Sequence, residues 1–192
     1  MNDVDWLKVA RPGRVPAWIE LRLGDITNTR VDAIVNAAND ELAVGGGVDG
    51  AIHDAAGPEI ATELMARYAG CATGNAVVSG PGHLAEHGVR AIIHAVGPMW
   101  RGGAHEEADL LRSAYQAALR LADASGMKSV AFPAISAGIY AYPLDQAAVI
   151  ATRAVRDGLA EAESVDHVVF ALFARDVLDA FERALAQIAG TV

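Results

Sequence analysis

The sequence is short of the features that mark disulfide-bonded, metal-bound and membrane proteins. It holds a single cysteine, Cys71, which excludes an intramolecular disulfide and disfavours a cysteine-based zinc site. The first twenty residues carry charges but no apolar core of a signal peptide. No apolar run approaches the roughly 20 residues of a membrane-spanning helix. These absences predict a cytoplasmic protein that contacts no membrane.

Basic residues are also scarce. The chain has 15 Lys and Arg against 24 Asp and Glu, for a net charge of −9. A field of that sign repels nucleic acid, so no nucleic-acid partner is expected. Backbone N–H groups and helix ends, rather than overall charge, would have to hold an anionic ligand. No metal site is expected either, because the histidines show no ligand spacing.

The remaining composition is that of a globular protein. The chain has 192 residues, of which 53% are hydrophobic and 20% charged, so one domain with a sizeable core is expected. Residues 1–16 hold charges, two prolines and a glycine. They are predicted to form an N-terminal extension, with a short helix around Trp6, and residues 17–192 to form the domain.

Strand and helix patterns alternate along the domain. Residues 18–23 alternate apolar and polar side chains, as a half-buried strand does, and residues 33–35 form a short apolar run typical of a strand buried on both faces. Further strands are predicted at 76–78, 91–94, 130–132 and 168–173, and helices at 48–56, 58–68, 106–124, 144–159 and 177–188. This order predicts an α/β fold: a three-layer αβα sandwich around a mixed, mostly parallel sheet.

A glycine-rich loop follows the strand at 33–35. Three successive glycines, Gly45, Gly46 and Gly47, lead into the next helix. They allow close backbone approach to a ligand, and with the helix N-terminus they form an anion site. Gly45, Gly47 and Gly50 match the spacing of the dinucleotide fingerprint, but the match is weak because the glycines begin about nine residues after the strand. The loop is no P-loop, since no Lys-Ser/Thr follows the glycines.

Two polar residues follow these glycines on one helix face, Asp49 and His53. Asp49 either only starts the helix or acts on the ligand, and its place beside the glycines favours function. For His53 a packed, hydrogen-bonded role is favoured. A second small-residue loop spans 133–143, where Ser136 could serve as a nucleophile. It lacks the full nucleophile-elbow pattern, because Ala134 stands where glycine is required.

Five segments together resemble a macrodomain of the MacroD type. They are 24–27 (GDIT), 31–39 (VDAIVNAAN), 45–53 (GGGVDGAIH), 93–98 (IHAVGP) and 135–140 (ISAGIY). The resemblance runs from about Ile19 to the last helix, with the segments in order and correctly spaced. It implies the αβα fold and a cleft for ADP-ribose, with no cofactor.

The resemblance also implies roles for individual residues. Asp25 would accept a hydrogen bond from the adenine amino group beside the Ile26 backbone, and Phe173 would stack near the adenine. Asn39 and Asp49 form the catalytic pair, Asn39 contacting the distal ribose and Asp49 positioning or activating a water. Tyr140 would pack on that ribose. The residues that would hold the diphosphate are Gly45, Gly46, Gly47, Val48, Ser136, Ala137, Gly138, Ile139 and Tyr140.

Three residues depart from the family pattern: Val44 and Ala141 replace glycines, and Ala137 replaces a threonine. The activity implied is hydrolysis of mono-ADP-ribose esters on acidic side chains of proteins, and deacetylation of O-acetyl-ADP-ribose. The expected partners are therefore ADP-ribose, O-acetyl-ADP-ribose and mono-ADP-ribosylated proteins. The alternatives are a non-catalytic ADP-ribose reader and, last, an esterase that uses Ser136.

Overall fold

The computed structural model describes residues 6–189. The strands are β1 (Trp6–Val9), β2 (Ala17–Leu23), β3 (Ala33–Ala38), β4 (Ala76–Ser79), β5 (Ala91–Val96), β6 (Ser129–Phe132) and β7 (His167–Leu172). The α-helices are α1 (Val48–Ala56), α2 (Glu59–Arg67), α3 (Glu107–Ala124), α4 (Leu144–Glu161) and α5 (Arg175–Ala189). Two 3-10 turns, η1 (Ile26–Asn28) and η2 (Gly82–His87), complete the set.

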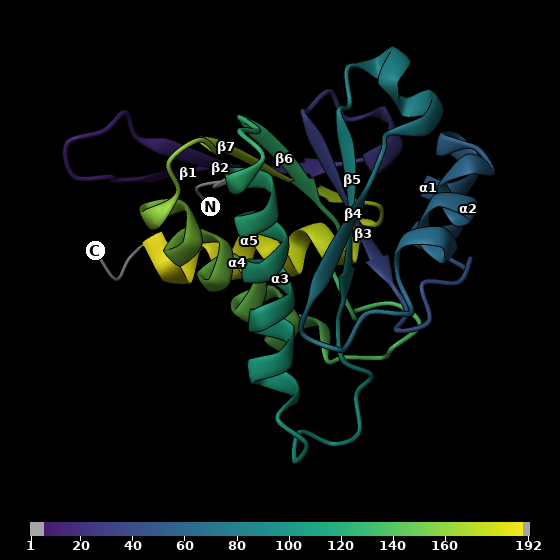
Figure 1. Cartoon of the computed structure of the whole chain (residues 1–192). Coiled ribbons are helices and arrows are strands. Elements are labelled where there is room, and N and C mark those ends of the chain that lie inside the picture. Colours follow the sequence, from purple (N-terminus) through teal and green to yellow (C-terminus); the bar gives the residue numbers. More distant parts are fainter. Residues whose placement is uncertain (1–5, 190–192) are drawn as a thin grey trace.

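The strands of this described part form one mixed sheet. Its order is β1-β2-β7-β6-β3-β5-β4, and only the outermost pairs, β1–β2 and β4–β5, are antiparallel. The inner strands β2, β7, β6, β3 and β5 run parallel. Their carboxyl ends therefore lie along one edge of the sheet, from which the connecting loops project (Figure 1).

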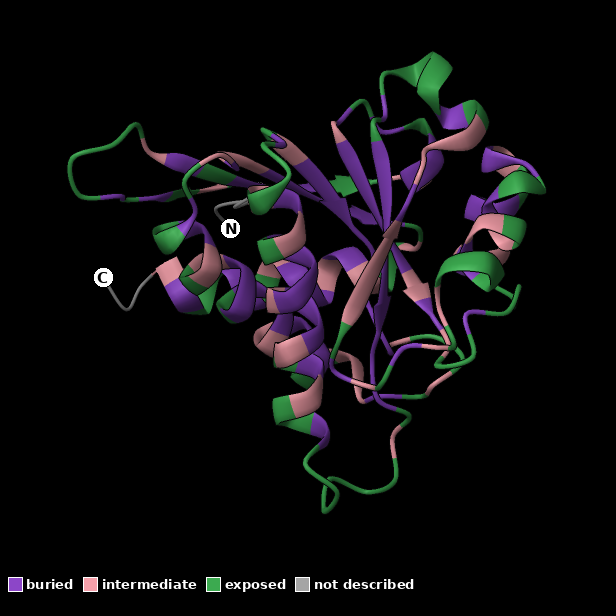
Figure 2. Ribbon diagram, in the orientation of Figure 1, coloured by how far each residue is buried: buried purple, intermediate pink, exposed green. Residues whose placement is uncertain are grey.

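Helices cover both faces of the sheet, as Figure 1 shows. One apolar core joins the sheet to α3, α4 and α5, and a second joins it to α1, α2 and η2. The inner strands are buried almost throughout, whereas the helices expose their outer faces (Figure 2). The predicted three-layer αβα sandwich is confirmed. No helix in residues 6–189 is long and apolar enough to cross a membrane.

The helix predicted around Trp6 is wrong, because residues 6–9 form strand β1. This strand pairs antiparallel with β2 and covers its hydrogen-bonding edge. The Trp6 ring packs edge-on against Trp18, and the Lys8 ammonium lies over the same indole. Residues 1–5 lie outside the described part. The domain boundary after residue 16 stays a prediction. Strand β1 lies before that boundary, within the predicted extension, and still pairs with the sheet.

The sheet opens between β3 and β6. Their ladder holds only two register pairs, Ala33 with Val130 and Ile34 with Ala131, while β3 continues to Ala38. The chain leaves β3 toward α1 on one face of the sheet and leaves β6 toward α4 on the other face. Such a switch point in an α/β sheet leaves a crevice at the carboxyl ends of the strands. The fold thus positions a cleft between the two loops singled out in the sequence.

Candidate functional site

A cleft of about 570 Å³ occupies this crevice. Its size falls within the range of small-molecule sites, roughly 300–1,000 Å³. It is lined by the segments that follow β2, β3, β6 and β7. Every residue predicted for the site lines it: Asp25, Ile26, Asn39, Gly45, Gly46, Gly47, Val48, Asp49, Ser136, Ala137, Gly138, Ile139, Tyr140 and Phe173. The structure thus brings the predicted residues together, while the role of each stays a prediction.

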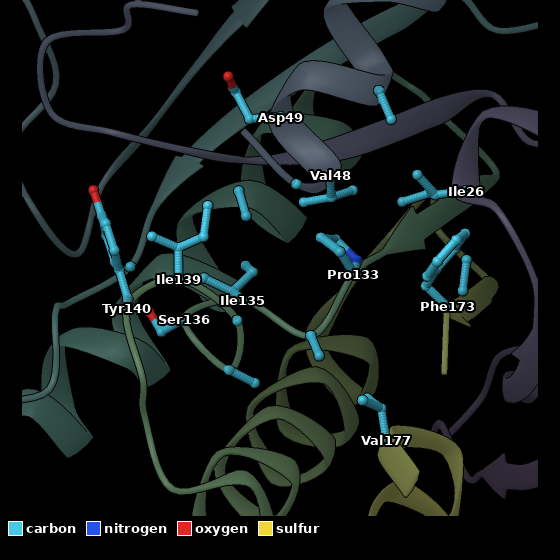
Figure 3. A pocket seen from close by; sticks show the side chains of 18 of the residues that line it. Ile26, Val48, Asp49, Pro133, Ile135, Ser136, Ile139, Tyr140, Phe173 and Val177 are labelled. Atoms are coloured by element: carbon cyan, nitrogen blue, oxygen red, sulfur yellow. The ribbon is translucent and has the colours of Figure 1, made fainter. Parts of the chain in front are cut away.

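The cleft is elongated and its two ends differ chemically. Figure 3 shows Tyr140 and Asp49 toward one end and Ile26 and Phe173 at the other. Phe173, directly after β7, is 83% exposed, so its ring is available to a flat ligand group. Burial, and then the carboxylates of Asp40 and Asp49, raise the pKa of Tyr140. Its hydroxyl is therefore protonated at neutral pH and can donate a hydrogen bond.

The glycine loop forms one long wall. Gly47 has φ +63° and ψ −134°, a conformation that a side chain strongly disfavours, and it precedes the first residue of α1. A Cβ at Gly46 or Gly47 would point at the Ile139 methyl group, at 3.5 and 3.7 Å. The two loops therefore face each other across the cleft. N–H groups at this helix start suit an anion such as a diphosphate.

Asp49 is held firmly in the first turn of α1. Its side chain accepts hydrogen bonds from Asn36 Nδ2 at Oδ1 and from the Gly45 N–H at Oδ2, both at 2.5 Å. The residue is only 4% exposed. Since each carboxylate oxygen has a further lone pair, Asp49 can still accept a hydrogen bond from a water in the cleft. The arrangement fixes both the carboxylate and the start of the glycine loop.

A buried polar chain behind Asp49 was missed by sequence reasoning. Asn36 Nδ2 also lies 3.1 Å from His94 Nδ1, and His94 Nε2 lies 2.9 Å from Ser79 Oγ. Because the amide supplies the donor, His94 accepts at Nδ1 and donates from Nε2 to Ser79, which in turn donates to the Gly80 carbonyl. This direction of hydrogen bonds keeps the Asn36 amide turned toward Asp49.

The alternation of residues in β3 and β5 contains a sequence signal for these buried hydrogen bonds. Asn36 lies between Ile34 and Ala38, and its register partner His94 lies between Ile92 and Val96. Those four apolar residues all face the core beneath α1 and α2. Alternation therefore points the two polar residues into the same core. A polar pair so placed needs partners, and the nearest is the first turn of α1.

We expect His94 to make the fold sensitive to acid. Burial, and to a lesser extent His53, lowers the pKa of His94 from 6.5 to about 3. Between these pH values the unfolded chain binds more protons than the folded protein. The stability contribution is therefore complete above pH 6.5 and is lost as the pH falls toward 3, by at most about 1.4 kcal/mol per pH unit.

Urea unfolding at pH 6.5 and pH 5.0 tests this expectation against the variant His94→Gln. The loss of unfolding free energy between the two pH values should be about 1.5 kcal/mol smaller in the variant. Above pH 7.5 the two proteins should show the same pH dependence. Equal losses in both proteins on acidification would contradict the assignment of a neutral, buried His94.

Two residues predicted to contact the ligand, Asn39 and Asp25, also form hydrogen bonds with nearby residues of the protein. Asn39 donates from Nδ2 to the Ala43 carbonyl at 2.6 Å and accepts from the Ala43 N–H at 3.0 Å, which closes the turn before the glycines. Asp25 caps η1, accepting at Oδ1 from the N–H and the hydroxyl of Thr27. Both side chains line the cleft. Local hydrogen bonds thus hold each of these two side chains in a fixed position at its own end of the cleft.

The second loop is anchored at both ends. The Tyr115 hydroxyl of α3 donates to the Pro133 carbonyl and accepts from the Ile135 N–H. Further along, Trp100 N–H donates to the Tyr140 carbonyl at 2.9 Å. Ser136 and Ala141 both have positive φ, +65° and +53°, a strained conformation for residues with a side chain. The loop is thus shaped by its anchors rather than by glycine alone.

Among residues 6–189, Ser136 has no base within hydrogen-bond reach. Its Oγ is buried without a hydrogen-bond partner and sits where a Cβ on Gly97 would lie 2.3 Å away. The predicted packed role of His53 fits its position: it is buried, with Nε2 3.7 Å from Asp49 Oδ1. A serine nucleophile needs a base within hydrogen-bond reach. The geometry therefore gives no support to Ser136 as a nucleophile.

Known proteins are similar to this chain over most of its length. The family model described as Macro domain matches residues 35–151. A macro domain-containing protein of Caldanaerobacter subterraneus is 48% identical over 173 residues, which cover 88% of this chain and 97% of that protein. The O-acetyl-ADP-ribose deacetylase of Salmonella typhimurium is 48% identical over 167 residues, covering 85% and 92% of the two chains.

Solved structures agree with these relatives. The Oceanobacillus iheyensis macrodomain with ADP superposes with a TM-score of 0.86 at 33% identity, over 97% of this chain and 98% of that one. The Trypanosoma brucei macrodomain in complex with ADP-ribose gives 0.79 at 38% identity, over 87% of this chain and 68% of that one. Both comparisons therefore show the same layered fold over most of this chain.

Proposed function

Since the chain belongs to the macrodomain family, we propose that it binds ADP-ribose and hydrolyses esters at the distal ribose. The substrates are mono-ADP-ribose esters on acidic side chains of proteins and O-acetyl-ADP-ribose. The single observation that carries this proposal is the buried Asp49 carboxylate, held by two hydrogen bonds at the start of the glycine loop.

The shape of the cleft supports one orientation of the ligand. The adenine lies at the end with Ile26 and Phe173, and the diphosphate lies between the glycine loop and Ile139. The distal ribose then lies between Asp49 and Tyr140 (Figure 3). A relative named O-acetyl-ADP-ribose deacetylase and a macrodomain solved with ADP-ribose support the same ligand.

The reaction consumes one water and needs no cofactor. In a protein ester the water oxygen bonds to the anomeric carbon of the distal ribose while the bond from that carbon to the carboxylate oxygen breaks. In O-acetyl-ADP-ribose it bonds to the acetyl carbonyl carbon while the bond from that carbon to the ribose oxygen breaks. The proton accepted from the water passes to the leaving oxygen, so a carboxylic acid and ADP-ribose are released. Asp49 orients the water and accepts its proton, while the Tyr140 hydroxyl and the N–H groups of the glycine loop hold the ribose and the diphosphate. A positioned acid/base group of this kind contributes about 10²–10⁴-fold to the rate.

Acetate release from O-acetyl-ADP-ribose under single-turnover conditions tests the proposal. The wild-type protein should release acetate, and Ser136→Ala should retain most of that activity. Release that disappears in Ser136→Ala but persists without Asp49 would favour the esterase. Micromolar binding of ADP-ribose by calorimetry with no release from any ester would identify a reader.

A further inference from the structure

A second hollow adjoins the distal end of the cleft. This distal pocket, of about 270 Å³, is lined by residues that include Asp40, Met99, Arg101 and His105. Tyr140 and Gly97 line both it and the main cleft, so the two hollows meet at the tyrosine. The volume is below the range typical of enclosed small-molecule sites. It suits a short stretch of chain that crosses the surface.

The loop between β5 and α3 forms a fixed wall of the distal pocket. The Glu107 carboxylate accepts hydrogen bonds from the N–H groups of Arg101, Gly103 and His105, at 2.6–3.1 Å. Burial opposes its ionisation, but the N–H group of Glu107 itself and these three N–H groups lower its pKa to about 2, so it stays charged. Figure 1 shows this loop projecting from the same edge of the sheet as the two ligand loops.

The loop wall presents an available positive charge. Arg101 is exposed, and its guanidinium has no hydrogen bond or ion pair with residues 6–189. The Glu107 carboxylate that lines the same pocket is occupied by backbone donors. Asp40, also exposed, supplies an acceptor elsewhere in the pocket. Guanidinium pairs favourably with a carboxylate, and an exposed acceptor suits backbone N–H groups of a bound chain.

We propose that the distal pocket binds the polypeptide segment that carries the ADP-ribose, with Arg101 pairing with an acidic residue next to the modified side chain. The inference rests on the proposed function, which places the distal ribose between Asp49 and Tyr140. A protein ester attached to that ribose leaves the cleft at this end, where Tyr140 borders the distal pocket. O-acetyl-ADP-ribose carries only an acetyl group and does not reach Arg101.

A charge reversal tests the pairing. Two peptides would each carry one mono-ADP-ribosylated glutamate, flanked by aspartates in one and by lysines in the other, with O-acetyl-ADP-ribose as a third substrate. The variant is Arg101→Glu, and the matched control is Arg153→Glu, which changes an exposed arginine of α4 that lines neither hollow. The measurement is kcat/KM for each substrate.

Wild type should prefer the aspartate-flanked peptide. Arg101→Glu should lower kcat/KM for that peptide about tenfold and raise it for the lysine-flanked peptide, since a close charge pair is replaced by repulsion. Its kcat/KM for O-acetyl-ADP-ribose should stay within twofold of wild type, and Arg153→Glu should change none of the three values. An unchanged peptide preference in Arg101→Glu, or an equal loss on all three substrates, would overturn the inference.

The proposal of hydrolysis and the proposal of peptide binding in the distal pocket can be refuted separately. If wild type hydrolyses none of the three substrates, hydrolysis is refuted, and calorimetric affinities of the two intact peptides become the readout for the pocket. A preference of wild type for the aspartate-flanked peptide that reverses in Arg101→Glu would still support the pocket. Equal affinities in both proteins would refute it.

Discussion

Replacing Asp49 with alanine is expected to lower the rate of ester hydrolysis by about 10² or more. The affinity for ADP-ribose should stay within about tenfold of wild type, because Gly46, Gly47 and Ile139 are retained and only the anchor of the loop at Gly45 is lost. The physical reason is that, in the proposed binding mode, Asp49 orients the attacking water, and its carboxylate is fixed by Asn36 Nδ2 and the Gly45 N–H. Single-turnover hydrolysis and calorimetry on the same preparation measure the two quantities.

The alanine variant also leaves two donors without their partner, at a cost of about 1–3 kcal/mol for each that stays buried. Asp49→Asn serves as the matched control, because its side-chain oxygen can still accept one of the two hydrogen bonds. It should be more stable than Asp49→Ala and equally slow in hydrolysis. Hydrolysis at the wild-type rate by a folded Asp49→Asn protein would remove Asp49 from the chemistry.

Replacing Gly46 with glutamate is expected to abolish ADP-ribose binding. The side chain would start 3.5 Å from the Ile139 methyl group and extend into the gap between the two loops. Its charge would meet the diphosphate in a region built to attract anions, so both bulk and repulsion oppose the ligand. Calorimetry should show a loss of affinity of at least about 100-fold.

The control for this change is Gly46→Ala. Its Cβ makes an ordinary contact with Ile139, and Gly46 does not have the positive φ that Gly47 has. Alanine should therefore bind ADP-ribose within a few-fold of wild type. Retained binding in Gly46→Glu would show that the ligand does not pass between the glycine loop and Ile139, and would remove the phosphate-loop assignment.

Most of the fold and the cleft residues could be predicted from local patterns. The helix predicted at 48–56 coincides with α1, and the strands at 33–35 and 130–132 lie within β3 and β6. Strong periodicity and glycine clusters are local signals, so they can be read without tertiary information. The cleft followed, because the loops after parallel strands meet at one edge of the sheet.

Other features depend on contacts between distant segments. Residues 6–9 are too few to show a period, and they form β1 only because β2 offers an edge. The Asn36–His94 contact depends on the register between β3 and β5. The distal pocket depends on the Glu107 carboxylate, which accepts hydrogen bonds from N–H groups of the preceding loop and so holds that loop in place. None of these pairings has a signature within a single window of sequence.

The most direct test of the central claim is the release of ADP-ribose from a protein mono-ADP-ribosylated on glutamate, followed in single turnover for wild type. Wild type should release free ADP-ribose, with little or none released in the same time by Asp49→Ala. An intact ester after incubation with wild-type protein that binds ADP-ribose would contradict it, and would leave the cleft as a binding site without hydrolysis of protein esters.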